Sequence, residues 1–198
     1  MGEVMSGNRM DRRAAVARLL EGRKDLLVVT GLGSPSYDAM AAGDHPMNYY
    51  LWAAMGSATT VGLGLAMSQP DKSVLVLTGD GELMMGVGAL ATVSVTGPKN
   101  LTIAVLDNGL FGETGQQLSH AGKGIEISKL AASMDFAWTG IVEDEAGIDD
   151  LRGRLARRDG PQLATIKVTG ENAPRVLPPR DGVHIKNRFR SALGFEPI

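Results

Sequence analysis

Two short motifs place oxygen-bearing side chains directly after apolar segments. Residues 78–81 read TGDG, with the carboxylate of Asp80 between two glycines, and residues 107–109 read DNG, with the amide of Asn108. A carboxylate beside phosphate groups repels them unless a cation lies between, so Asp80 is a candidate Mg²⁺ ligand that bridges to a diphosphate. Asn108 supplies a second oxygen, and Mg²⁺ tolerates such an incomplete protein shell because phosphates and waters complete its octahedron.

Each motif alone is a common turn signal. The two become a site only if both preceding strands end at the same edge of one sheet, which an ordinary right-handed crossover between them would achieve. The turn at Gly79 and Gly81 also opens a helix, whose free N–H groups attract anions. The pair, 28 positions apart across one helix, therefore indicates an anion and metal site more strongly than either motif does.

The elements that must position these motifs can be read from apolar runs. Runs rich in β-branched residues predict strands buried on both faces at Leu26–Thr30, Val74–Thr78, Leu101–Leu106 and Leu163–Val168, with a further short strand at Trp138–Val142. Helices are expected at Asp11–Gly22, Met55–Ser68, Leu83–Val95, Ile127–Met134, Ile148–Asp159 and about His184–Leu193. In the first helix we expect the arginines opposite the apolar side. The alternation predicts one α/β domain of three layers, with a doubly wound, mostly parallel sheet and its ligand at the carboxyl ends of the strands.

The composition excludes several classes of protein. The 198 residues suffice for one domain, and a net charge of −2 with 43% apolar residues fits neither a basic nucleic-acid-binding protein nor a disordered acidic one. The absence of cysteine excludes disulfides, thiolate zinc sites, iron–sulfur clusters ligated by cysteine and a cysteine nucleophile. The polar N-terminal residues MGEVMSGN and the lack of a long apolar run lead us to expect a cytoplasmic chain that binds no membrane.

The segment GDGELMMGVGALATVSVTGPKNLTIAVLDN, which ends at Asn108, resembles the thiamin-diphosphate-binding motif, in which GDG is followed one helix and one strand later by two asparagines. Here Asp107 replaces the first asparagine. Residues 53–66 (AAMGSATTVGLGLA) resemble the same family. From LLVVTGLGSPSYD through the last helix, the chain most resembles the thiamin-diphosphate-dependent 2-oxoacid decarboxylases, in particular the β subunits of sulfopyruvate decarboxylases and the matching part of phosphonopyruvate decarboxylases.

The resemblance implies a set of site residues. The Mg²⁺ ligands would be the side chains of Asp80 and Asn108 and the backbone carbonyl of Leu110. The positions implied around thiamin diphosphate are Gly31, Gly33, Met55, Gly56, Gly79, Asp80, Gly81, Glu82, Asn108, Leu110, Phe111 and Gly112. Met55 would support the bent cofactor, although a methionine among small residues is more often core filler, and the loop at Gly31 and Gly33 is equally readable as a plain turn.

One departure concerns Glu82, which follows GDG where decarboxylases of this group usually carry serine. A carboxylate at a helix start favours the helix dipole but opposes a phosphate unless the side chain turns away, so its role stays open.

The resemblance also implies an incomplete enzyme. We divide the chain into an N-terminal helix (1–24), a domain of the thiamin-diphosphate-binding (PP) type that binds the cofactor and Mg²⁺ (25–172), and a C-terminal tail and helix (173–198). No stretch remains for the pyrimidine-binding domain, so we expect its activating glutamate on a separate α subunit, in a hetero-oligomer that is a dimer of dimers or larger. The expected reaction is decarboxylation of a small anionic 2-oxoacid, of the sulfopyruvate or phosphonopyruvate type, to an aldehyde and CO₂.

The groups on this chain that would act in that reaction are open. His45 and His120 are weak candidates for proton donors, because a lone histidine is more often a surface residue. Candidates for binding a sulfonate or phosphonate are Lys123, Arg180, His184, Lys186 and Arg188.

Three other interpretations remain. One is a carboligase like acetolactate synthase, because carboligation and decarboxylation share an intermediate and differ only in the acceptor. Glu82 also suits a transketolase-like subunit, although such subunits are longer and use several histidines, of which this chain has three. A noncatalytic nucleotide-binding α/β module lacks support, since the third glycine of G-x-G-x-x-G is missing after Gly31 and Gly33 and no Walker loop is present.

Overall fold

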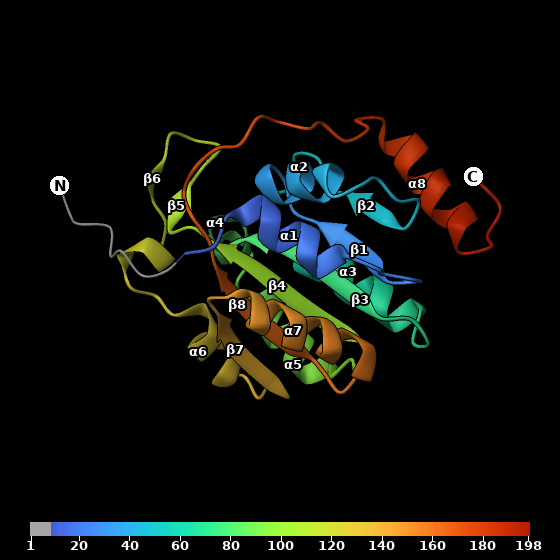
Figure 1. Ribbon diagram of the computed structural model, residues 1–198. Helices are drawn as coiled ribbons and strands as arrows, with labels where there is room; N and C mark the ends of the chain where they lie inside the picture. The colour runs from blue at the N-terminus through green and yellow to red at the C-terminus, as the bar shows by residue number, and fades with distance from the viewer. Residues whose placement is uncertain (1–8) are drawn as a thin grey trace.

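The computed structural model describes residues 9–198, and the expectation of a polar, leaderless N-terminus at residues 1–8 lies outside this range. Six parallel strands form one sheet in the order β2-β1-β3-β4-β8-β7 (Figure 1). The strands are β1 (Leu27–Thr30), β2 (Asn48–Tyr50), β3 (Val74–Gly79), β4 (Leu101–Asp107), β7 (Trp138–Val142) and β8 (Gln162–Lys167). The predicted doubly wound, parallel α/β fold is confirmed.

Helices cover both faces of the sheet and make the three layers. One face carries α1 (Arg12–Leu20), α2 (Ser34–Ala41) and α7 (Glu145–Arg157), and the other carries α3 (Ala58–Ser68), α5 (Ala89–Thr96) and α6 (Ile127–Ala132) (Figure 1). The remaining elements are α4 (Asp80–Met85), α8 (Gly182–Ala192), a short 3₁₀ turn (Ala121–Lys123) and a hairpin of β5 (Leu110–Phe111) and β6 (Gln117–Leu118).

The strands separate two apolar cores. In β3, Leu75 and Leu77 face the core under α1 and α7, whereas Val74 and Val76 face the core under α3 and α5. All four side chains are fully buried. This explains why the strand segments read as continuous apolar runs rather than alternating ones.

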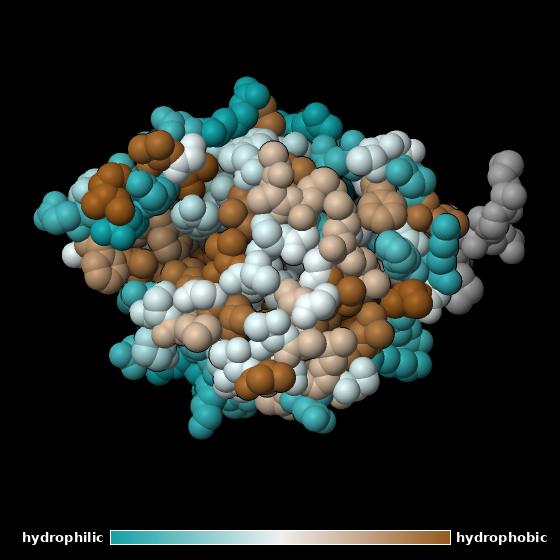
Figure 2. All heavy atoms as spheres, turned by 180° about the vertical axis from the view of Figure 1, so that it is seen from behind, coloured by the Kyte–Doolittle hydropathy of each residue, from teal (hydrophilic) through white to brown (hydrophobic). Residues whose placement is uncertain are grey.

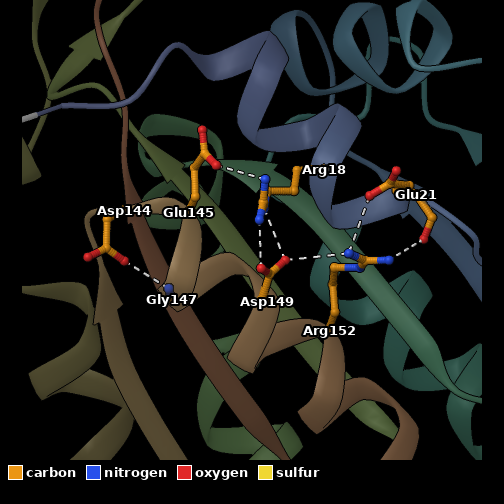
Figure 3. Close-up of polar contacts among 7 residues, drawn as sticks. All are labelled: Arg18, Glu21, Asp144, Glu145, Gly147, Asp149 and Arg152. Carbon is orange, nitrogen blue, oxygen red and sulfur yellow. Dashed lines mark hydrogen bonds and ion pairs between the residues drawn. The ribbon is translucent and has the colours of Figure 1, made fainter.

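Side chains of α1 and α7 form a network of ion pairs on the surface (Figure 3). Arg18 of α1 donates to Asp149 at 2.7 and 3.0 Å and to Glu145 at 2.7 Å, and Arg152 donates to the carbonyl of Glu21 at 2.8 Å. At the start of α7, the Asp144 side chain accepts a hydrogen bond from the N–H of Gly147 at 2.8 Å. The network therefore ties α1 to α7.

The topology creates a crevice between β1 and β3. After β1 the chain passes into α2 on one face, and after β3 it passes into α4 and α5 on the other. Such a switch point, at the carboxyl ends of parallel strands, is where open α/β sheets bind ligands. Thr30, which ends β1, and Gly79, which ends β3, both lie at this edge.

Several elements differ from the sequence-based expectations. The helix expected from Met55 begins only at Ala58, because Gly56 adopts a positive φ of 84°. The helix expected at Leu83–Val95 is two helices with a break at Gly86–Gly88. The short elements α2, β2 and the β5–β6 hairpin were not predicted.

After β8, an extended segment crosses the α2 side of the molecule to α8 (Figure 1). Arg13 donates to the carbonyl of Pro174 at 2.8 Å, and the indole N–H of Trp52 donates to that of Pro179 at 2.8 Å. Within residues 9–198, each helix is too short or too polar to cross a membrane.

Candidate functional site

A pocket that is open to solvent lies at the switch point. Its walls come from the first turn of α1, the loop after β1, the turn before α3, the start of α4 and the loop after β4. The lining residues are Arg12, Leu32, Ser34, Pro35, Met55, Gly79, Asp80, Gly81, Glu82, Leu106, Asn108, Leu110, Phe111, Gly112, Glu113 and Thr114.

Asp80 lies at the first position of α4 with 2% of its surface exposed. Burial raises the pKa of its carboxyl group to about 6, the nearby charge of Asp107 adds to this effect, and a hydrogen bond from the Ser119 hydroxyl opposes it. No cationic side chain among the described residues forms an ion pair with Asp80. A buried carboxylate without a counter-ion is costly, so this position favours a bound cation.

Asn108 follows the neighbouring strand at the same edge. The register pairs Gly79 of β3 with Leu106 of β4, so the residues that continue from these two strands lie side by side. The Asn108 side-chain oxygen accepts a hydrogen bond from the N–H of Leu110 at 2.9 Å, which fixes its orientation, and an amide oxygen retains a second lone pair. The two predicted side-chain ligands of the metal thus line one pocket, as does Leu110, whose carbonyl is the third predicted ligand.

Asp107, which replaces the asparagine of the motif, points elsewhere. Its carboxylate pairs with Lys167 at the end of β8 at 2.5 Å and accepts the N–H of Gly109 at 3.0 Å. Lys167 neutralises the additional charge, so the substitution is compensated within the chain. The pair also holds the loop that carries Asn108.

Glu82 lines the pocket, but its carboxylate hydrogen-bonds to the protein. One oxygen accepts the N–H groups of Gly56 at 2.8 Å and Ala58 at 3.3 Å, and the other accepts the hydroxyl of Thr78. With both oxygens engaged by protein donors, the carboxylate fixes the turn that presents Met55 to the pocket. This answers the question that the sequence left open about Glu82.

Glycines permit close backbone approach around this turn. A Cβ on Gly86 would lie 1.9 Å from the carbonyl oxygen of Gly56, so the break between α4 and α5 packs directly against the turn at Met55. A Cβ on Gly81 would lie 2.6 Å from the ring of Phe111. Gly62 of α3 packs against Val76 of the sheet, whereas Gly64 faces open space.

The loop after β1 has the geometry of a tight βα turn. The N–H of Gly31 donates to the carbonyl of Leu77 at 2.8 Å, and Gly33 has a positive φ of 83° immediately before α2. Leu32, Ser34 and Pro35 of this segment line the pocket. The loop predicted as a ligand-binding element therefore reaches the site.

Arg12 lines the pocket but was not expected there, since the arginines of the first helix were predicted to lie opposite its apolar side. The structure shows that this prediction was wrong for Arg12, which is 5% exposed. The signal was present in the sequence: Arg12 takes the first position of the buried stripe that continues through Ala15, Val16 and Leu19.

The two histidine candidates are not brought together. His45 precedes β2, whose first residue pairs with the second residue of β1, so it lies at the amino ends of the strands, and its Nδ1 accepts the N–H of Met47 at 3.1 Å. As a proton donor near the site, His45 was a wrong prediction. His120 is exposed, with its ring edge-on to Phe111 at 6.0 Å between centroids.

The cations considered for substrate binding are distributed elsewhere. Arg188 pairs with Asp44 at 2.5 Å, and Lys186 donates to the carbonyl of Ile198 at 2.6 Å, both around α8. Neither they nor Lys123, Arg180 and His184 line the pocket.

The residues present fit a magnesium diphosphate. No cluster of three or more His, Cys, Asp or Glu side chains within residues 9–198 is arranged to hold a metal. Mg²⁺ bound with a diphosphate does not require one, because a carboxylate, an amide oxygen and a backbone carbonyl leave room for phosphate oxygens. The uncompensated carboxylate of Asp80 and the start of α4 beside it have the charges that such a group needs.

Comparison with known proteins agrees with this geometry. Residues 32–163 match the family model described as thiamine pyrophosphate enzyme, C-terminal TPP binding domain. The chain is 35% identical to the sulfopyruvate decarboxylase subunit beta of Methanothermobacter thermautotrophicus over 91% of this chain and 94% of that protein. It is 36% identical to the phosphonopyruvate decarboxylase of Streptomyces viridochromogenes over 97% of this chain, and it spans about half (48%) of that protein.

Among solved structures, the benzoylformate decarboxylase of Polynucleobacter necessarius superimposes with a TM-score of 0.69 at 18% identity. The match covers 88% of this chain and 36% of that one. At this identity the match is evidence for the fold alone.

Proposed function

We propose, on the premise that the chain belongs to the thiamine pyrophosphate enzyme family, that it is the diphosphate- and Mg²⁺-binding subunit of a decarboxylase. The substrate would be a small anionic 2-oxoacid of the sulfopyruvate or phosphonopyruvate type, and the products an aldehyde and CO₂. The substrate class is that of the two relatives described above, each of which matches more than nine-tenths of the chain. The observation that carries the proposal is the buried, uncompensated carboxylate of Asp80 beside Asn108 at neighbouring strand ends.

A partner subunit is part of the proposal. The support is the identity of the Methanothermobacter relative as a subunit beta, and the character of the face formed by α3, α4 and α5. From residue 53 to 69 and from 83 to 98 the sequence has no charged residue, yet Met67, Met85 and Val95 are exposed. Figure 2, which views the molecule from behind, shows a broad white and brown region with the hydrophilic colour toward its rim.

This uncharged face adjoins the pocket. Met55, itself 37% exposed, lines the pocket, and Met85 lies next to the Gly86 contact with the same turn. A partner chain that covers the face would therefore reach the cofactor. Apolar patches of this kind are typical of protein interfaces. We infer that the α subunit binds here and brings the group that activates the cofactor's pyrimidine ring.

The chain's own residues would bind and orient the cofactor. Asp80, Asn108 and the Leu110 carbonyl would hold Mg²⁺, and the first amides of α4 would face the diphosphate. Met55 would support the cofactor from the turn that Glu82 fixes. When bound, thiamin diphosphate supplies the nucleophilic carbon and the electron sink for loss of CO₂.

The experiment is a titration of thiamin diphosphate with and without Mg²⁺, into this chain alone and into its complex with the chain that copurifies with it. We expect Mg²⁺-dependent binding that is tighter in the complex, and release of CO₂ from 2-oxoacids that bear a sulfonate or phosphonate. Failure to bind the cofactor in both forms, or binding of NAD instead, would overturn the proposal.

A further inference from the structure

The guanidinium of Arg12 has unused hydrogen-bonding capacity inside the protein. Its Nε donates to Asp38 at 2.5 Å, and its Nη1 is buried with no hydrogen-bond partner among the described residues. Orphaned buried donors are rare because each costs free energy comparable to a lost hydrogen bond. A buried arginine with a free nitrogen beside a pocket indicates that a ligand completes its bonding.

The cluster around Arg12 carries excess positive charge. Arg12 and Arg13 share the single carboxylate of Asp38, which is fully buried. Two guanidinium groups against one carboxylate leave one positive charge uncompensated. Arg12 is the part of this cluster that lines the pocket, whereas Arg13 turns outward and donates to the carbonyl of Pro174.

The other charged residues of the described lining are acidic. Asp80, Glu82 and Glu113 contribute carboxylates, and Arg12 is the one positively charged residue of the lining. A diphosphate bound with one Mg²⁺ keeps net negative charge, so in this setting it needs a further cation. Arginine suits this task because its planar fork matches the oxygens of a phosphate.

The position of Arg12 indicates which phosphate it would contact. Arg9, three residues earlier, donates to the carbonyls of Asp107 and Val168, so the start of α1 lies against the strand end that precedes Asn108. Asp38, which orients Arg12, belongs to α2, and Ser34 and Pro35 at the start of that helix also line the pocket. Met55, on which the thiazolium would rest, lies in the turn before α3, and α3 covers the face of the sheet opposite to α1 and α2.

Resting on the proposed function, we propose that Arg12 is a cofactor-binding residue that donates hydrogen bonds to the distal phosphate of thiamin diphosphate, with Asp38 as the positioning residue that orients it.

The test compares thiamin diphosphate with thiamin monophosphate, which lacks the distal phosphate. Dissociation constants are measured calorimetrically with Mg²⁺ in whichever form of the wild-type protein binds the cofactor. For Arg12→Gln we expect the affinity for the diphosphate to fall about 10- to 100-fold, as for loss of hydrogen bonds to a charged group, and that for the monophosphate to change far less. Arg13→Gln is the matched control, since it removes the other partner of Asp38 and should leave both affinities nearly unchanged.

Two results would overturn the inference: diphosphate affinity of folded Arg12→Gln equal to that of the wild type, or an equal loss for both ligands. If Arg12→Gln does not fold, the double variant Arg12→Gln with Asp38→Asn removes the buried charge together with its partner and is measured in the same way. Absence of cofactor binding by the wild-type protein would instead count against the proposed function, so the two failures are distinguishable.

Discussion

Two arginines of helix α1, six residues apart, lie in contrasting environments. Arg18, on the surface, makes three hydrogen bonds to the carboxylates of Asp149 and Glu145 (Figure 3). Arg12, buried at the pocket, makes one hydrogen bond and leaves a nitrogen without a partner. The surface charge of Arg18 is balanced by carboxylates of the chain, although water could also have solvated it. The buried charges of Arg12 and Asp80 at the pocket are not balanced in this way.

The same difference separates the carboxylates of the two regions. A hydrogen bond from Arg18 lowers the pKa of Asp149, whereas burial raises the pKa of Asp80 to about 6. The pocket therefore contains a buried carboxylate whose charged form is unfavourable for folding. Imbalance of charge, rather than its density, therefore distinguishes the candidate site from an ordinary charged surface.

The largest expected effect is that of removing the central carboxylate. Asp80→Ala should abolish Mg²⁺-dependent retention of thiamin diphosphate, with a loss of affinity of more than about 100-fold, because the other carboxylate near the end of β3, that of Glu82, has both oxygens engaged by protein donors. Calorimetric titration measures the loss, and circular dichroism checks the fold. Retention near wild-type affinity would defeat the assignment of Asp80 as a ligand.

The charge on Asp80 that metal binding requires should destabilise the metal-free protein. The folded pKa of Asp80, about 6, exceeds its ordinary value of 3.8, so the stability from its neutral form is present below about pH 4 and is lost as the pH rises through 6. Without metal, Asp80→Asn should be more stable than the wild type at pH 7.5 by up to about 3 kcal/mol, and this advantage should vanish near pH 4. Denaturant unfolding at the two pH values measures it.

Addition of Mg²⁺ and thiamin diphosphate should reverse that order at pH 7.5, because only the wild-type carboxylate gains from the cation. An advantage of Asp80→Asn that persists unchanged at pH 4 would show that burial of the charge is not its cause.

A smaller effect is expected at the turn behind the cofactor. Glu82→Gln keeps the size of the side chain but weakens the charge-assisted hydrogen bonds to Gly56 and Ala58, so turnover should fall about tenfold through misplacement of Met55. Steady-state kinetics should show the loss mainly in kcat. The exposed Glu126→Gln is the control, and equal behaviour of the two variants would count against a role for Glu82 in orienting the turn.

The smallest effect is expected in the surface network. Arg18→Ala removes three hydrogen bonds, yet such exposed pairs are screened by water and salt, so thermal stability should change only slightly and cofactor affinity not at all. Thermal scans at low and high salt provide the measurement. A marked loss of cofactor affinity would contradict the assignment of Arg12 to the site and of Arg18 to the surface alone.

The sequence alone predicted those features that local patterns determine. Continuous apolar runs placed five strands of the sheet, and the motifs around Asp80 and Asn108 placed two oxygens at one edge. The break between α4 and α5 could not be predicted, because its cause is contact between Gly56 and Gly86, which are far apart in the chain. Likewise, the partners of Glu82 lie on a distant turn. Arg12 was predictable from its place on the buried stripe of α1, but polarity was given more weight than periodicity.

The central claim is that Asp80 and Asn108 together hold the metal of a diphosphate cofactor. The most direct measurement is a crystal structure with thiamin diphosphate and Mn²⁺ in place of Mg²⁺, in which anomalous scattering locates the ion. We expect one peak within coordination distance of the Asp80 carboxylate and the Asn108 side-chain oxygen. A cofactor bound with its metal out of reach of either side chain would contradict it.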